Sequence, residues 1–249
     1  MDKLISILLV SIMVAFASRG YSQVSAIRDG NGNIANLHQM KITPVLGDLQ
    51  SDGITENGGR LNYAHIKGSP FLWDEWEIAT LHQIEKNLGT IRVRLNLATH
   101  ELHFKRDDEE LVLSNEELNK IVFHRSSDSV VFIKHPDLLL NRKKLNAFMQ
   151  VLNEGNFQLL KYTLRVVGEA DSLFGTRKRY FFKDEVAYYI KANEKIDLVK
   201  RLNKENIFLL IPTSSQHKDW IKSHLINFKI EEDVIKYLSY FNSKLSKEK

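Results

Sequence analysis

The sequence predicts an α+β fold, in which a mainly antiparallel β-sheet is followed by α-helices at the C-terminus. One observation is a period of two in hydrophobicity over residues 90–97, which is typical of a strand with one buried face. A second is the series of turn segments between further alternating stretches, as in a meander of hairpins. A third is the change to helical spacing after Asp197. A curled sheet and an open barrel are both compatible with this pattern.

Alternating or short apolar stretches predict the strands, and residues with turn propensity separate them. The strands are expected at residues 90–97, 102–104, 111–113, 121–124, 130–134, 147–152, 158–167, 179–182 and 186–191. The turns are expected at residues 87–89, 99–100, 107–110, 154–156 and 183–185. Ser114 and Glu117 have the spacing of a capping box and predict one short helical turn at residues 114–117.

The helical region is expected from about residue 203. A short helix at residues 203–211 and a second at 216–225 are separated by Pro212 and the polar residues that follow it. The last helix has the strongest pattern, because its apolar side chains recur at spacings of four, four, three and four on one stripe. These side chains are Ile230, Val234, Leu238, Phe241 and Leu245.

Residues 1–22 are expected to be a cleavable signal peptide. Lys3 precedes an apolar run at residues 4–16, and a small-residue cleavage site at residues 20–22 is preferred over one at 15–17. The run is shorter than the ~20 residues that a membrane-spanning helix needs, so an anchor is the less favoured alternative. Without cysteine, neither a lipid-modified cysteine nor a disulfide can form. We expect a mature chain without a transmembrane span, located in the periplasm, at the outer-membrane periphery or outside the cell.

The mature chain is expected to have two parts. Residues 23–67 form a Gly- and Asn-rich leader that is expected to be loosely ordered, and residues 68–249 form one β-rich domain. Residues 29–33 match the start of a calcium loop, but Ile34 stands where that loop needs glycine and Met40 where it needs glutamate. A plain turn is therefore the preferred interpretation of this stretch.

Composition and motifs argue against several function classes. Removal of residues 1–22 lowers the formal net charge from +4 to +3, and no basic-aromatic repeat develops, so nucleic acid is not an expected partner. The nine histidines lack the local spacing of a metal site, and His100 and His103 would point to opposite faces of a regular strand. We expect no metal and no cofactor, and we find no G-x-S-x-G, P-loop or dinucleotide motif.

The candidate ligand-binding residues form one local cluster that combines aromatic rings and carboxylates. They are Trp73, Asp74, Glu75 and Trp76. Aromatic faces beside carboxylates can hold sugar rings or cations. A glycosidase would need a second carboxylate about 5–9 Å from the first, which this local sequence cannot place. The structural alternative is that both indoles close the end of the sheet core, and no catalytic residue is assigned.

Three stretches carry a resemblance to a known family. They are residues 68–76 (Gly-Ser-Pro-Phe-Leu-Trp-Asp-Glu-Trp), 152–155 (Leu-Asn-Glu-Gly) and 233–242 (Asp-Val-Ile-Lys-Tyr-Leu-Ser-Tyr-Phe-Asn). Together with the intervening meander they resemble a family of uncharacterised exported proteins of Gram-negative bacteria, over roughly residues 68–245. The resemblance implies an envelope or secreted location and a β-sheet domain with a helical C-terminus. It implies no activity, and no functional residue is transferred from it.

These observations favour an exported binding or assembly module without catalytic activity. Its partner would be an envelope protein or a carbohydrate. One alternative is an exported carbohydrate-active hydrolase with its site near residues 73–76. Another is a periplasmic accessory protein or chaperone that holds an outer-membrane partner at an exposed sheet edge.

Overall fold

The computed structural model describes residues 66–245 and short strands between residues 27 and 62. Gaps in the first range fall at residues 85, 108, 114–117, 127, 136–138, 141–142, 145–146, 172–177, 194 and 213–214. The predicted signal peptide, the calcium-like turn at residues 29–33 and the helical turn at 114–117 lie outside the described residues.

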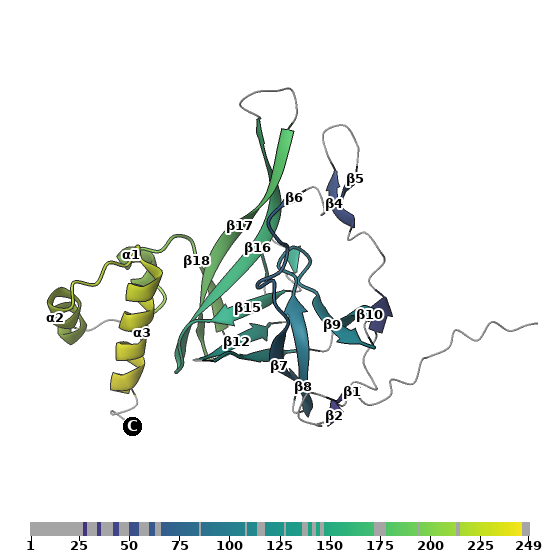
Figure 1. Cartoon of the computed structure of the whole chain (residues 1–249). Coiled ribbons are helices and arrows are strands. Elements are labelled where there is room, and N and C mark those ends of the chain that lie inside the picture. The colour runs from purple at the N-terminus through teal and green to yellow at the C-terminus, as the bar shows by residue number, and fades with distance from the viewer. Residues whose placement is uncertain are drawn as a thin grey trace, which may run out of the picture.

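The fold is α+β, as the sequence predicts, and one large open sheet dominates it (Figure 1). The twelve strands of this sheet are β3 (Ile42–Pro44), β6 (Ile66–Lys67), β7 (Glu77–Gln83), β8 (Lys86–Leu95), β9 (Leu102–Arg106), β10 (Glu109–Leu113), β11 (Lys120–His124), β12 (Ser129–Lys134), β15 (Phe148–Val151), β16 (Phe157–Asp171), β17 (Lys178–Ala192) and β18 (Lys195–Val199). Three further pairs are β1 (Ile27–Arg28) with β2 (Ile34–Ala35), β4 (Gln50–Ile54) with β5 (Arg60–Asn62), and β13 (Leu139–Leu140) with β14 (Lys143–Lys144).

The sheet consists of two meanders that meet at β7 and β11. Its order is β18-β17-β16-β15-β12-β11-β7-β8-β9-β10-β3, so the chain leaves β10 and resumes on the other side of β7. The sheet is mixed because β6 pairs in parallel with β17. Two strands of the predicted leader thus join the sheet, β3 at its edge beside β10 and β6 beside β17.

A crossing segment, residues 66–72, connects two distant strands of the sheet. It starts as β6 on β17 and then reaches the end of β8, where Leu97 N–H donates to the Pro70 carbonyl. Arg165 of β16 holds the segment from below by donating to the carbonyl groups of Ser69 and Phe71. These contacts draw β8 towards the hairpin of β16 and β17, which curls the sheet without closing it.

The hairpin of β16 and β17 is longer than the sequence indicates. A turn at residues 183–185 was expected between two short strands, and this prediction is wrong, because β17 continues through these residues in unbroken register with β16. The cause is a cross-strand partner. Arg165 forms a two-pronged ion pair with Asp184, at 2.7 and 3.0 Å, which stabilises the charged residues in the strand.

The turn expected at residues 87–89 is also wrong, because these residues lie inside β8. Gly89 has a positive φ of 108°, and the register between β7 and β8 shifts opposite it, between Leu81 and His82. Such an irregularity lets a strand continue through a glycine. Leu88 beside it is buried although it lies three residues before the buried Ile91, because the irregularity shifts the phase of the alternation at this point.

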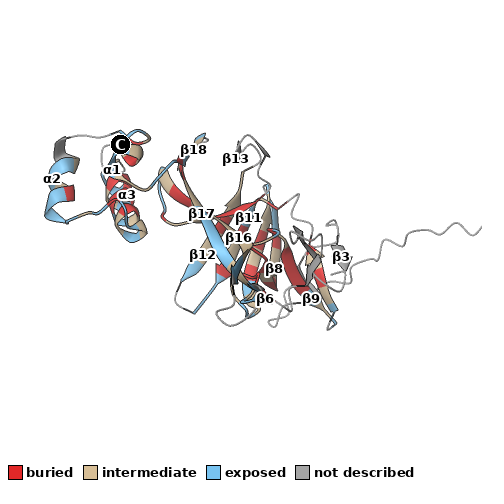
Figure 2. Ribbon diagram, turned by 90° about the horizontal axis from the view of Figure 1, so that it is seen from above, coloured by how far each residue is buried: buried red, intermediate tan, exposed pale blue. Residues whose placement is uncertain are grey.

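The three C-terminal helices are α1 (Lys204–Phe208), α2 (Ser215–Ser223) and α3 (Glu231–Leu245), close to their predicted positions. Asn203 caps α1 by accepting from the N–H of Asn206. The buried stripe of α3 packs with α1, α2 and the near face of β16 to β18, and Figure 2 shows its buried side. No helix in the described part of the chain is both long and apolar enough to cross a lipid bilayer.

Side-chain amides join α3 to the turn between β15 and β16. Asn242 accepts from the N–H of Phe157 and donates to the carbonyls of Glu154 and Phe157. Asn153 donates to the same two carbonyls and accepts from the N–H of Leu159. Asn153 and Asn242 are called the amide cluster below. The cluster satisfies backbone groups that the helix covers, so it fixes where α3 docks.

Candidate functional site

The candidate ligand-binding residues 73–76 lie on a loop between the crossing segment and β7. Asp74 and Glu75 are exposed, whereas Trp73 and Trp76 are half-buried. Trp73 packs against the core of the first meander and meets Phe123 edge-on, with ring centroids 5.2 Å apart. One side of the Trp73 indole therefore supports the core, and both indoles are partly open to solvent.

Cationic side chains lie over both indoles. The guanidinium carbon of Arg125 is 4.4 Å from the centre of the Trp73 ring, and that of Arg94 is 4.2 Å from the Trp76 ring. Lys105 also approaches Trp76, at 5.3 Å. Cation–π attraction holds these groups together, so a sugar that stacks on the same face would have to displace an arginine.

Arg94 is held by three neighbours at once. Its guanidinium carbon is 3.9 Å from the centre of the Phe71 ring, in addition to its contact with Trp76. One of its terminal nitrogens donates to both carboxylate oxygens of Glu110, at 2.8 and 3.0 Å. The aromatic rings and the carboxylate leave this side chain little freedom, so Arg94 is a fixed positive charge at the base of the loop.

His103 completes a charged cluster, which we define as Arg94, His103 and Glu110. Its Nδ1 lies 2.8 Å from a Glu110 carboxylate oxygen, and its side chain is fully buried. Burial lowers the pKa of His103, and the neighbouring Glu110 opposes that shift. The neutral ring therefore donates through Nδ1, and its buried Nε2 has no hydrogen-bond partner among the described residues, like Nε of Arg94.

The charged cluster differs from a pair of catalytic carboxylates. Its one carboxylate, Glu110, is occupied by a guanidinium and an imidazole, whereas Asp74 and Glu75 lie exposed on the loop. In the described part of the chain, no three His, Asp or Glu side chains gather in a geometry that could hold a metal ion. The arrangement can position charge and aromatic surface, which are properties of a binding surface.

The sequence does not predict the charged cluster, because its members come from three strands. Arg94 stands directly opposite His103 between β8 and β9, and His103 stands opposite Val112 between β9 and β10. These neighbours can be identified only once the register of the β8–β9 and β9–β10 pairs is known. The alternation over residues 90–97 predicts that Arg94 lies on the solvent-exposed face of its strand. In the structure its side chain is mostly covered, at 18% exposed.

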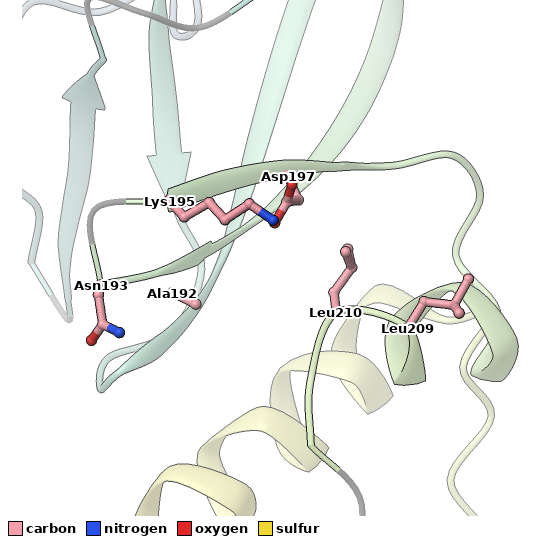
Figure 3. Close-up of a pocket in the computed structure, with 6 residues that line it drawn as sticks. All are labelled: Ala192, Asn193, Lys195, Asp197, Leu209 and Leu210. Carbon is pink, nitrogen blue, oxygen red and sulfur yellow. The ribbon is translucent and has the colours of Figure 1, made fainter.

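A separate hollow of about 480 Å³ lies between the turn after β17 and the end of α1 (Figure 3). Its lining residues are Ala192, Asn193, Lys195, Asp197, Leu209 and Leu210. Lys195 and Asp197 are ion-paired at 2.8 Å, so they neutralise each other. The hollow offers leucine side chains on one side and a compensated ion pair on the other, and it holds no catalytic pair.

The hairpin of β16 and β17 extends past its neighbouring strands (Figure 1). β15 pairs only with residues 160–161 of β16, and β18 only with residues 188–192 of β17. Beyond these points the described strands leave most of the β16 outer edge without a partner strand. The outer edge of β17 pairs with β6 at residues 180–181. The projecting hairpin, with its largely unpaired β16 edge, is a third candidate site, suited to contacts through the backbone.

Comparison with known proteins gives no further guide to the site: no family model, no curated protein and no solved structure matches the chain.

Proposed function

We propose that the chain is an exported module that binds or assembles with a partner in the cell envelope and has no catalytic activity of its own. The observation that carries this proposal is the projecting hairpin of β16 and β17, with its long outer edge. The signal peptide predicted at residues 1–22 and the resemblance to uncharacterised exported proteins of Gram-negative bacteria support a periplasmic, outer-membrane or secreted location.

The direction of the backbone N–H and C=O groups along β16 shows which residues could bond to an added strand. The N–H groups of Leu159 and Arg165 both point away from β17, towards Asn153 and Leu97 respectively. Because hydrogen-bonding direction alternates along an antiparallel strand, Thr163 and Val167 present their N–H and C=O groups to the same side. No described strand lies beside these two residues.

An extended segment of an envelope protein is the partner that suits this edge. Strand addition supplies backbone hydrogen bonds to the unpaired groups, and the alternate side chains of β16 supply selectivity. Arg165 cannot shift to accommodate a neighbour freely, since its side chain holds both Asp184 and the crossing segment. We therefore place the docking strand beyond Arg165, along Val167 and the residues after it.

Proline at position 167 tests this proposal. Val167→Pro removes an outward N–H while keeping the hydrogen bonds between β16 and β17, whereas Val167→Thr keeps the N–H and serves as the matched control. We expect affinity-tagged mature protein and V167T to recover the same envelope protein from envelope fractions. V167P should lose it while retaining the wild-type circular dichroism spectrum. Equal recovery by all three proteins would contradict the proposed edge.

The alternative of a carbohydrate-active hydrolase draws on the two tryptophans and two exposed carboxylates at residues 73–76. It requires a carboxylate that faces Asp74 or Glu75, and one open face on each indole. Assays of purified mature protein against panels of glycosides and esters separate the two functions. Hydrolysis by a monomeric chain, abolished in D74N or E75Q, would replace the binding proposal with the enzymatic one.

A further inference from the structure

The sheet ends at β18, and the proposed function does not use the outer edge of this strand. β18 pairs with β17 on one side, and no described strand lies beside it on the other. The helices pack over the face of the sheet that carries Leu159, Ile190 and Val199, in one apolar cluster. The backbone groups on the outer side of β18 are therefore available to a further strand.

The bonding pattern of the neighbouring strands shows which residues of β18 point to this outer edge. Leu159 bonds towards β15, since its carbonyl accepts from the N–H that follows β15, at 2.9 Å. Ile190, which stands opposite Leu159 on β17, therefore bonds towards β18, where Asp197 is its partner. The direction alternates along the strand, so Ile196 and Leu198 direct their N–H and C=O groups outwards.

Exposed apolar and charged side chains border the same edge. Leu198 is 46% exposed, on the opposite face of β18 from Asp197, and Leu209 at the end of α1 is 77% exposed. Leu209 lines the hollow of Figure 3 together with Lys195 and Asp197, whose side chains are 76% and 34% exposed. A strand that docks on β18 would thus meet a leucine on each face and one charge of each sign.

The sequence of β18 is complementary to a second copy of itself. If two copies pair antiparallel about a two-fold axis at Ile196, this residue stands opposite its own equivalent. Lys195 then stands opposite Asp197 of the second copy, and Asp197 opposite Lys195, so two ion pairs form between the copies. The pair of β-branched isoleucines lies on the other face of the sheet, where it adds an apolar contact.

Charge separates this register from its neighbours. An axis at Asp197 would place two carboxylates opposite each other, which is unfavourable. An axis at Leu198 would bring Lys195 opposite Arg201 of the second copy, so that two cations face each other. With the axis at Ile196, the two charged residues of β18 face only opposite charges.

We propose that two copies of this chain associate by pairing their β18 strands antiparallel about an axis at Ile196, so that the sheet continues from one copy into the other. The second copy then covers the leucines beside the edge. Because the contact is small, we expect a weak dimer with a dissociation constant on the order of 100 µM. The association goes beyond the proposed function and uses no residue of the partner site on β16.

Cysteine trapping tests the register, because the chain contains no native cysteine. Ile196→Cys places two thiols opposite each other in the dimer, with Cα atoms about 5.5 Å apart, a distance that a disulfide bridges. The matched control is Ile84→Cys, because Ile84 is 77% exposed but lies in the turn between β7 and β8. Under mild oxidation, we expect mature I196C to form a disulfide-linked dimer about tenfold faster than I84C, D197C or L198C.

Exchange of the charges tests the ion pairs without a cross-link. Lys195→Asp places acids opposite each other and should raise the dissociation constant about tenfold in sedimentation analysis. The double variant K195D/D197K restores opposite charges and should dimerise like the wild type. V167P, which alters the β16 edge, should also dimerise like the wild type, so this proposal and the proposed function can fail independently.

Four results would overturn the proposal. The first is a wild type that sediments as a monomer at concentrations well above ~100 µM. Equal trapping rates for I196C and I84C would show that the thiols meet only by random collision. Faster trapping of D197C or L198C than of I196C would contradict the register. A dimer that K195D leaves unchanged would place the contact elsewhere on the molecule.

Discussion

The amide cluster and the charged cluster are two groups of buried or partly buried polar side chains that contact the same sheet. Asn153 and Asn242 are neutral, and their side-chain amides bond to backbone groups of residues 154, 157 and 159. Arg94 and Glu110 carry charge beside the neutral ring of His103, and Nε of Arg94 and Nε2 of His103 have no hydrogen-bond partner among the described residues. The amide cluster fixes one docking geometry for α3. The charged cluster instead keeps unpaired donors and a titratable histidine, which can bind a further group or change with pH.

The largest expected effect is at Gly155, beside the amide cluster. Gly155 has a φ of +111°, and an added Cβ would lie 2.5 Å from the side-chain amide of Asn242. Gly155→Ala therefore combines backbone strain with overpacking, and we expect it to lower the free energy of unfolding by about 4 kcal/mol in urea denaturation.

Gly68→Ala is the matched control for Gly155. Its φ is +99°, but the nearest atom to an added Cβ is 3.8 Å away, on Phe182. This substitution introduces strain without a clash, so the expected loss is about 1 kcal/mol. Equal losses at the two glycines would mean that the contact with Asn242 adds nothing, and that the amide cluster does not fix the position of α3.

The next largest effect is a pH dependence of stability that His100, in the turn before β9, is expected to cause. Burial lowers the pKa of His100 to about 4, from an ordinary value of 6.5. The unfolded chain therefore binds more protons between these pH values, and stability falls as the pH is lowered through this window. We expect the wild type to lose about 3 kcal/mol more than His100→Asn between pH 7 and pH 4.

Asparagine is a suitable replacement for His100, because it tolerates the φ of +55° at this position without titrating. Urea denaturation of both proteins at several pH values measures the difference. Parallel curves for wild type and H100N would show that the folded and unfolded chains bind protons equally at His100, so that burial does not lower its pKa.

A smaller effect is expected at Glu110, the centre of the charged cluster. Glu110→Gln leaves the guanidinium of Arg94 without its counter-charge, and the two side chains are 29% and 18% exposed. We expect a loss of about 2 kcal/mol at pH 7 by thermal or urea unfolding. Solvent screening keeps this value below that of a fully buried pair.

Glu185→Gln provides the comparison for Glu110. Glu185 is 3.8 Å from Lys183, and both side chains are more than half exposed, at 60% and 53%. Removing this pair should change stability by no more than about 0.5 kcal/mol. Similar losses in E110Q and E185Q would place the charged cluster among ordinary surface ion pairs and remove its distinction.

Local patterns were sufficient to predict some elements and failed at others for identifiable reasons. The apolar stripe of α3 depends on neighbours within one or two helical turns. Its members Val234, Leu238 and Phe241 are buried as the sequence predicts, whereas Ile230 precedes the helix and is exposed. The turn expected at residues 183–185 fails because three adjacent charged residues resemble a turn when their partner is unknown. That partner, Arg165, lies across the hairpin on β16.

At the candidate site, the sequence indicates the residue types but not their surroundings. The sequence identifies residues 73–76 as an aromatic and acidic cluster, and the structure places them together on one loop beside the sheet. The cations over the two indoles come from elsewhere in the chain: Arg94 lies on β8 and Arg125 directly follows β11. No local pattern contains the register that brings β8, β9 and β10 side by side.

The sequence by itself determined the α+β class, most strands and the three helices, because periodicity and capping are properties of short stretches. Tertiary structure alone decided how stretches far apart in the sequence meet. The Gly-Ser-Pro stretch became the crossing segment held by Arg165, and the Leu-Asn-Glu-Gly turn met Asn242 of α3. These contacts join residues about 90 positions apart, and only the packing of strands and helices brings such residues within hydrogen-bonding distance.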